Sequence, residues 1–250
     1  MRVAITGAAT GIGAEVVLKL KNQGHTVTAF DLVEISQNVD NFTQLDLSNN
    51  TSIEEALKNT KGTFNALINN AGIPPRENTE QKILMVNYIG MKTFLDGMLS
   101  KLNHGASIVN TSSRAGSMWQ ENLKQVKRLM QLGVSELSNF VSKENIDPVR
   151  AYNLSKEAVN VLTMSRTEEL LAKGFIKKDL KHANTMDFRA RFKSGEKKTY
   201  TYYSIGGGFI KREGVQHKKS RKAEIPFPIQ KAEEILKWCT KENKSLSEIS

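Results

Sequence analysis

The chain has 250 residues, a formal net charge of +10 and one cysteine, Cys239. This length holds one α/β domain with room for a smaller module, and a single cysteine excludes a disulfide framework or a multi-cysteine metal site within the chain. No apolar run is long enough to span a bilayer, and the first residues read as a strand rather than a signal peptide. We therefore expect a cytoplasmic protein that does not enter a membrane.

The positive charge is concentrated in the C-terminal third. Residues 174–250 carry 18 Lys/Arg and 9 Asp/Glu, whereas residues 1–173 are nearly balanced at 18 and 17. A basic segment can attract nucleic acid or anionic lipid. Its lysines alternate with strand-like and helix-like patterns, which favours a solvated surface, so we do not expect nucleic acid as a partner.

The chain begins with a strand, a glycine turn and a helix. Arg2–Thr6 is rich in β-forming residues, residues 7–13 read Gly-Ala-Ala-Thr-Gly-Ile-Gly, and a helical pattern follows through Leu20. Glycines let a backbone approach a pyrophosphate, and a helix N-terminus supplies N–H donors. The spacing G-x-x-x-G-x-G differs from the dinucleotide fingerprint G-x-G-x-x-G, so an ordinary tight turn is the alternative.

The second expected strand, His25–Phe30, is followed by Asp31. A carboxylate at this position accepts hydrogen bonds from ribose hydroxyls and repels a 2′-phosphate, which favours NAD(H) over NADP(H). A turn-initiating aspartate is the alternative.

The rest of the N-terminal part alternates strands and helices. Expected strands are Phe42–Leu45, Phe64–Asn69 and Ala106–Thr111, and expected helices are Thr51–Asn59 and Gln81–Leu99. This alternation predicts an α/β fold with a doubly wound parallel sheet, whose ligands bind at the C-terminal ends of the strands.

Tyr152 and Lys156 lie four residues apart, which places them on one face of a helix. A nearby ammonium favours the phenolate form of a tyrosine, so the pair can act as a proton-transfer device. An exposed helical pair without a function is the alternative.

Residues 1 to about 175 resemble the short-chain dehydrogenase/reductase family. The resemblance rests on ordered motifs: Thr6-Gly7-x-x-x-Gly11-Ile12-Gly13, Asn69-Asn70-Ala71-Gly72, Val86-Asn87-Tyr88, Ser112-Ser113 and Tyr152-x-x-x-Lys156. It implies a Rossmann sheet, NAD as cofactor and a small alcohol or ketone as substrate. It also implies a homo-oligomer paired through the helices of Asn87 and Tyr152, a surface that the long stretch between Ser113 and Tyr152 interrupts.

The resemblance also implies roles for individual residues. Tyr152 would be the acid or base, Lys156 would assist it and hold the nicotinamide ribose, and Ser113 would bind the substrate oxygen, with Ser112 as the fallback. Asn87 would anchor a water that relays protons to Lys156. The residues expected to bind the cofactor are Thr6, Gly7, Gly11, Ile12, Gly13, Asp31, Asp46, Leu47, Asn70, Ala71, Gly72, Tyr152 and Lys156.

The stretch between Ser113 and Tyr152 is longer than in most of this family, and it resembles the bacterial 3α-hydroxysteroid dehydrogenase/carbonyl reductase subgroup. Within it, Leu123, Val126, Leu129, Met130 and Gly133 follow one apolar helical stripe. In that subgroup the insertion lies near the substrate entrance. A helical surface insertion without a substrate role is the alternative.

The family pattern stops near residue 175, so we expect a Rossmann sheet that lacks its last strands. A β-hairpin, Thr185–Phe192 with Thr199–Ile205, and an amphipathic helix from Ile229 to Cys239 are expected after it. This tail resembles the iron–sulfur L-serine dehydratases through His182–Met186, Tyr202–Ile210 and Pro226-Phe227-Pro228. The cluster-binding cysteines of those enzymes are absent, so we expect neither a metal site nor deaminase activity.

The expected organisation is therefore a dehydrogenase domain at 1–176 joined to a serine-dehydratase-like fragment at 177–250. The expected function is NAD(H)-dependent hydride transfer between a secondary alcohol and a ketone. Two alternatives are an NAD(H)-binding but catalytically impaired chimera and a dehydratase-related fragment that interacts with or regulates a partner.

Overall fold

The computed structural model describes residues 1–166, 170, 185–191 and 197–203. The chain forms two compact units, Met1–Val161 and Leu162–Ser250. The domain boundary expected at residues 176–177 lies outside the described residues.

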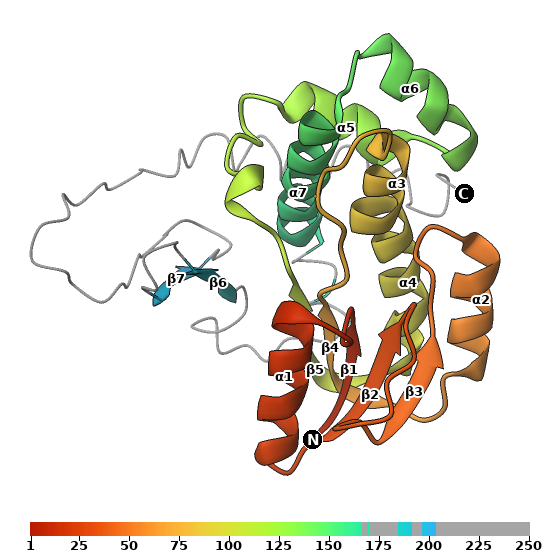
Figure 1. The fold of residues 1–250 in the computed structure, drawn as a ribbon, viewed down its shortest axis with the longest axis vertical. Helices are drawn as coiled ribbons and strands as arrows, with labels where there is room; N and C mark the ends of the chain where they lie inside the picture. The colour runs from red at the N-terminus through yellow and green to blue at the C-terminus, as the bar shows by residue number, and fades with distance from the viewer. Residues whose placement is uncertain (167–169, 171–184, 192–196, 204–250) are drawn as a thin grey trace, which may run out of the picture. The chain divides into compact units, whose positions relative to one another are not determined.

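The first unit is built on a five-stranded parallel sheet (Figure 1). Its order is β3-β2-β1-β4-β5, and its strands are β1 (Arg2–Thr6), β2 (Thr26–Asp31), β3 (Asn41–Gln44), β4 (Phe64–Asn69) and β5 (Leu102–Asn110). Strands β2 and β3 lie on one side of β1, and β4 and β5 lie on the other. The loops after β1 and β4 therefore open next to each other at the C-terminal edge of the sheet. This confirms the expected Rossmann-like α/β sheet and places the predicted cofactor turn at its switch point.

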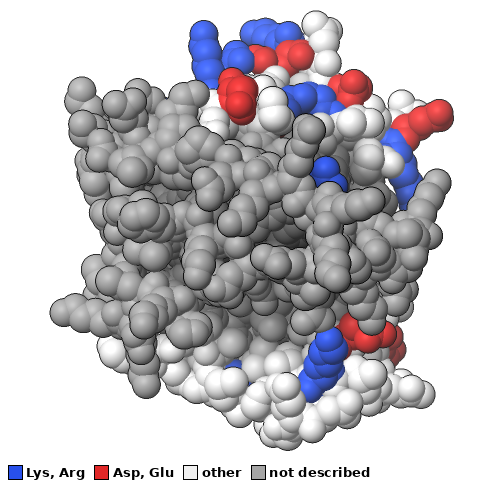
Figure 2. Space-filling view, turned by 90° about the vertical axis from the view of Figure 1, so that its left-hand side faces the viewer, with Lys and Arg blue, Asp and Glu red and all other residues white. Residues whose placement is uncertain are grey.

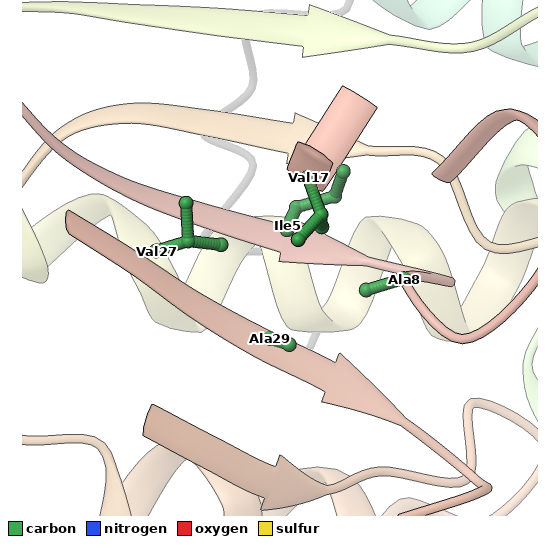
Figure 3. Packing of buried hydrophobic residues seen from close by; sticks show 5 residues of the cluster. All are labelled: Ile5, Ala8, Val17, Val27 and Ala29. Atoms are coloured by element: carbon green, nitrogen blue, oxygen red, sulfur yellow. The ribbon is translucent and has the colours of Figure 1, made fainter. Parts of the chain in front are cut away.

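Helix α1 (Gly11–Asn22) covers one face of the sheet. Figure 3 shows Val17 of this helix against Ile5 of β1, with Val27 and Ala29 of β2 beside them. All four side chains are buried, as is Ala8 in the turn before the helix. Successive strand residues point to opposite faces, so the odd-numbered strand residues Ile5, Val27 and Ala29 form one layer of the core.

The opposite face packs against α4 (Gly90–Met98), which also contacts α2 (Asn50–Asn59). The rings of Phe30 in β2 and Phe94 in α4 meet edge to face with centroids 5.0 Å apart. The central strands carry apolar side chains on both faces, so their sequences are nearly continuous hydrophobic runs.

The helix expected over Gln81–Leu99 is interrupted. The structure has α3 (Glu80–Leu84), one π-helical turn (Met85–Ile89), α4 and a short 3₁₀ turn (Leu99–Lys101). A π turn accommodates one extra residue within a helix and is frequent at functional sites. Asn87, one of the predicted site residues, lies in this turn.

Strand β5 begins four residues before the expected Ala106. Leu102 pairs with Phe64 and Ser107 pairs with Ala66, so the register shifts between these two pairs. Gly105, with φ +77°, lies within the shifted stretch. Of the described strands, β4 is the one that pairs with β5, which therefore forms an edge of the sheet.

The segment between Ser113 and Tyr152 is largely helical. It contains the expected helix, here α5 (Leu123–Gln131), then α6 (Leu137–Lys143) and the start of α7 (Pro148–Ser165). Val126 and Leu129 of the expected apolar stripe are fully buried. A short 3₁₀ turn at Arg114–Gly116 precedes α5, and another at Val134–Glu136 lies between α5 and α6.

In the second unit, β6 (Thr185–Arg191) and β7 (Lys197–Tyr203) form an antiparallel pair, as expected for the hairpin. The expected helix at 229–239, Cys239 and His182 lie outside the described residues.

The part of the surface that Figure 2 shows for the described residues carries basic and acidic side chains side by side. None of the described helices is long and apolar enough to cross a membrane.

Candidate functional site

The glycine turn after β1 depends on glycine at two close approaches. A Cβ atom on Gly7 would lie 2.6 Å from the Ala71 Cα atom, and one on Gly13 would lie 1.8 Å from the Gly7 carbonyl oxygen. Gly7 and Gly11 have φ values of +67° and +57°, which also favour glycine. The turn is therefore fixed by sterics as well as by sequence.

The end of the turn presents main-chain donors. Helix α1 begins at Gly11, and its N-cap Thr10 makes no side-chain capping bond. The first N–H groups of a helix have no acceptor within it, and they carry the positive end of the helix dipole. Gly11 and Ile12 are exposed. This donor set fits the pyrophosphate of a dinucleotide.

The loop after β4 is tied to the glycine turn. The Thr6 hydroxyl accepts hydrogen bonds from the N–H groups of Asn70 and Ala71, both at 3.1 Å. The Asn70 side chain donates to the Gly7 carbonyl oxygen at 2.9 Å. The structure thus brings the first two predicted motifs into direct contact.

Asp31 at the end of β2 contacts the same turn. Its Oδ2 accepts a hydrogen bond from the Ala9 N–H (2.9 Å), and its Oδ1 accepts one from the Val33 N–H (3.1 Å). Each carboxylate oxygen has a further lone pair, so these bonds leave acceptor capacity for a ribose.

Asp46 and Leu47 follow β3. The Asp46 carboxylate accepts hydrogen bonds from the N–H and hydroxyl of Ser48, at 2.8 and 2.6 Å. Leu47 is buried, and a Cβ atom on Gly90 would lie 1.9 Å from its carbonyl oxygen. The structure therefore gives this pair a local structural role, and its predicted contact with adenine stays a prediction.

Asn87 reaches the loop after β4 from the π turn. Its Oδ1 accepts from the Ile73 N–H (2.7 Å) and its Nδ2 donates to the Ile73 carbonyl oxygen (3.0 Å). Its Nδ2 also lies 3.4 Å from the Ser155 hydroxyl on α7. Asn87 is buried, so it fixes this loop against α7.

The side-chain amine of Lys156 lies close to Gly72, next to Asn87. A Cβ atom on Gly72 would lie 3.2 Å from Asn87 Oδ1 and 3.5 Å from Lys156 Nζ. The ammonium donates to the Thr111 carbonyl oxygen at 3.0 Å, and it lies 5.9 Å from the centre of the Tyr152 ring. Burial lowers the pKa of Lys156 from 10.5 to about 8.

The two serines have different surroundings. The Ser112 hydroxyl donates to the Lys156 carbonyl oxygen at 3.0 Å, whereas the Ser113 hydroxyl accepts from the Ala115 N–H at 3.2 Å. Ser113 therefore retains its own O–H for donation. On the other side of the same turn, Asn160 donates to the Gly116 carbonyl oxygen at 2.9 Å.

Motif reading alone missed two parts of this arrangement. One is the Thr111 carbonyl, since every residue has a main-chain acceptor and the residue type does not indicate which one is used. The other is a buried carboxylate, Glu157, beside Lys156 in the sequence. In the described part of the chain, no three His, Cys, Asp or Glu side chains are grouped so that they could hold a metal ion.

Comparison with known proteins agrees with this geometry. The family model "short chain dehydrogenase" matches residues 1–124. The coniferyl-alcohol dehydrogenase of Pseudomonas sp. (strain HR199 / DSM 7063) is 33% identical over 169 residues, which cover 67% of this chain and 66% of that protein. The N-terminal part of this chain belongs to the short-chain dehydrogenase/reductase family.

Two further relatives support the family assignment. A diacetyl reductase [(S)-acetoin forming] of Staphylococcus aureus is 26% identical over 54% of this chain and 64% of its own length. The NADH complex of the 3-alpha-hydroxysteroid dehydrogenase from Pseudomonas sp. B-0831 has a TM-score of 0.60 at 25% identity, covering 70% of this dehydrogenase-like chain and 68% of that one. The chain thus spans 66% and 64% of the length of the two curated relatives.

A second family model, "Serine dehydratase beta chain", matches residues 114–215. This agrees with the resemblance seen in the tail, although the matched range begins well before residue 177 and ends before Pro226. It overlaps the dehydrogenase match at residues 114–124 and includes α5, α6 and α7.

Proposed function

We propose that this chain is an NAD(H)-dependent oxidoreductase that interconverts a secondary alcohol and a ketone. The observation that carries the proposal is the grouping of Lys156 and Asn87 at the loop after β4, with the Tyr152 ring centre 5.9 Å from the Lys156 ammonium. The names of the relatives denote dehydrogenation of alcohols or reduction of diacetyl.

The residues present fit a dinucleotide. The exposed N–H groups at the start of α1 would hold its pyrophosphate, and Asp31 would accept hydrogen bonds from the adenosine ribose. The carboxylate of Asp31 would repel a 2′-phosphate, which is why we propose NAD(H) rather than NADP(H). When bound, the nicotinamide supplies the hydride.

In the reductive direction, Tyr152 would donate its phenolic proton to the substrate oxygen, and in the oxidative direction it would remove the alcohol proton. Ser113 would donate a hydrogen bond to the same oxygen where negative charge develops. Lys156, held by Thr111, would place its positive charge beside the phenol. Asn87 would keep the loop of Gly72 and Ile73 in position next to that charge.

The test is NADH-dependent reduction of small ketones and NAD-dependent oxidation of secondary alcohols by the intact chain and by Tyr152→Phe. We expect turnover that Tyr152→Phe lowers by at least about 10²-fold while NADH binding, followed by nicotinamide fluorescence, is retained. Equal rates for both proteins would remove the enzymatic assignment.

A second candidate function is NAD(H) binding without turnover. The described sheet ends at β5, so the described residues offer no strand beyond it to line the nicotinamide side. NADH binding by a chain that oxidises no alcohol and reduces no ketone would support this function instead.

A third candidate is a role in binding or regulating a partner through the part that resembles the serine dehydratase beta chain. Failure to bind NADH would favour this candidate over the first two.

A further inference from the structure

Glu157 is a buried carboxylate on α7 with both oxygens engaged. Its side chain is 1% exposed. Oε1 accepts hydrogen bonds from Asn122 Nδ2 (2.8 Å) and Arg150 Nη1 (3.0 Å), and Oε2 accepts one from Arg150 Nη2 (2.8 Å). A charge is buried in this way only when it is paired and hydrogen-bonded, and the two parallel bonds from Arg150 fix its orientation as well.

Arg150 carries the contact onward to α5. Its Nε donates to Gln125 Oε1 at 2.8 Å, and its main-chain N–H donates to Asp147 Oδ1 at 2.7 Å, just before α7 begins. Arg150 thus joins the first turn of α7 to the first turn of α5.

The contacts continue from α5 to the end of α6. Gln125 Nε2 donates to Glu144 Oε2 at 3.1 Å, and Arg128 Nη2 donates to the same oxygen at 2.9 Å. These polar contacts therefore form one network from the helix that carries Tyr152 and Lys156 to both helices of the preceding segment. We call it the Glu157 network: Asn122, Gln125, Arg128, Glu144, Arg150 and Glu157.

The loop of Ser112 and Gly116 holds α7 at two further points. Ser112 donates to the Lys156 carbonyl oxygen, and Asn160 donates to the Gly116 carbonyl oxygen. A Cβ atom on Gly116 would lie 2.7 Å from that same Lys156 oxygen, so the loop and the helix are in close contact. The helix is thus held by this loop and by α5.

We propose that Glu157 is a positioning residue that fixes α7 against α5 and thereby sets the location of Tyr152 and Lys156. This inference rests on the proposed function for its catalytic consequence, but not for its structural one. Misplacing reacting groups by 1 Å can lower a rate by about 10²-fold. The segment containing α5 would then act on catalysis through the helix rather than by touching the substrate.

The test uses Glu157→Gln, which removes the charge at constant size, and Asn122→Ala, which removes only the hydrogen bond between Asn122 and Glu157 and no charge. The matched controls are Glu121→Gln and Asn139→Ala, whose side chains are exposed and outside the network. The readout is the pH profile of acetylation of Lys156 by trace acetic anhydride, followed by peptide mass spectrometry, which does not require turnover.

If Glu157 positions the helix, both variants loosen the burial of Lys156, and the midpoint of its labelling rises from about 8 toward 10.5. Loss of a nearby negative charge without any movement would instead lower the midpoint, so the direction separates the two explanations. Both controls should match the parent chain.

An unchanged or lowered midpoint in both variants would overturn the inference, and so would an equal rise in the controls. If Glu157→Gln does not fold, Asn122→Ala decides alone. Where the parent chain turns over substrate, kcat of Glu157→Gln should fall by about 10²-fold with a smaller change in NADH affinity, and an unchanged kcat would also overturn it. A parent chain without turnover would remove the proposed function but leave the labelling test decisive.

Discussion

The ammonium of Lys156 donates a hydrogen bond to the carbonyl oxygen of Thr111, 3.0 Å away, and so joins the middle of α7 to the first residue after β5. Thr111 is itself held in place, because its N–H donates to the Asn69 carbonyl oxygen at 2.8 Å. The position of Lys156 is therefore set by the C-terminal ends of two neighbouring strands. The cost of this position is the burial of an amine, which lowers its pKa to about 8.

This burial predicts a pH-dependent difference in stability between the parent chain and Lys156→Met. In the unfolded chain Lys156 keeps its proton up to about pH 10.5, whereas in the folded chain it loses it above about pH 8. The unfolded state binds more protons between these values, so the free energy of unfolding of the parent should rise with pH relative to the variant, by up to roughly 3 kcal/mol.

Urea denaturation at pH 7, 8, 9 and 10 measures this difference. Lys101→Met is the control, since Lys101 Nζ also donates to a main-chain carbonyl oxygen, that of Thr60, at 3.0 Å. A constant difference between the parent and Lys156→Met across this range would show that the amine is not buried as described.

The two neighbouring serines should separate catalysis from stability. We expect Ser113→Ala to lower kcat/KM by about 10²-fold, since its O–H is available to a substrate oxygen, with a loss of stability no greater than about 1 kcal/mol from the lost Ala115 N–H bond. We expect Ser112→Ala to lower stability by about 1 kcal/mol, because it removes the bond to the Lys156 carbonyl oxygen. Steady-state kinetics and thermal unfolding of both variants provide the measurement, and a reversed pattern would make Ser112 the substrate-binding serine.

Residues that follow a strand end were the easiest part of the arrangement to predict. Gly7, Asp31 and Asn70 each stand directly after an apolar run, and parallel strands bring such positions to one edge. Tyr152 and Lys156 could be paired from helical spacing alone. The fold and the edge positions of Gly7 and Asp31 thus followed from periodicity and topology, whereas the roles of Asn70, Tyr152 and Lys156 were implied by the resemblance to the dehydrogenase family.

Other features could not be read from the sequence, for specific physical reasons. The π turn at Asn87 inserts a single residue, which barely alters the apolar pattern of the surrounding helix. The pair Arg150 and Glu157 reads as two surface charges seven residues apart, because the bond from Asn122 to Glu157 spans 35 residues and is formed only in the folded chain. The early start of β5 was hidden by Gly105, which breaks the strand pattern.

The close approach of Gly13 to the Gly7 carbonyl oxygen predicts that Gly13→Ala weakens NADH binding. A methyl group placed 1.8 Å from that oxygen must displace the turn, which destabilises the fold by about 1–3 kcal/mol. We expect the displaced main-chain donors to lower NADH affinity by about tenfold or more, equivalent to about 1.4 kcal/mol. Gly24→Ala is the control, because Gly24 has φ +73° but no neighbouring atom within 4 Å. Its backbone strain should lower the stability of the fold without displacing the glycine turn, so NADH affinity should stay unchanged. Fluorescence titration with NADH compares the two, and equal affinities would place the dinucleotide elsewhere.

The proposed preference for NAD(H) over NADP(H) depends on the charge of Asp31. Asp31→Asn keeps an oxygen that can accept from the Ala9 N–H but removes the negative charge that a 2′-phosphate would meet. We expect the ratio of NADH to NADPH affinity to fall by about tenfold or more, equivalent to about 1.4 kcal/mol.

Asp40→Asn is the matched control for this change. The Asp40 carboxylate also accepts a main-chain bond, from the Val27 N–H at 2.7 Å, and it pairs with Lys21, which lowers its pKa. Removing this charge should affect stability but not the ratio of the two affinities. Two results would show that Asp31 does not repel a 2′-phosphate: a parent chain that binds NADPH as tightly as NADH, or an equal change of the ratio in both variants. The carboxylate at the end of β2 would then contribute only to the fold of the glycine turn, through its bond from the Ala9 N–H.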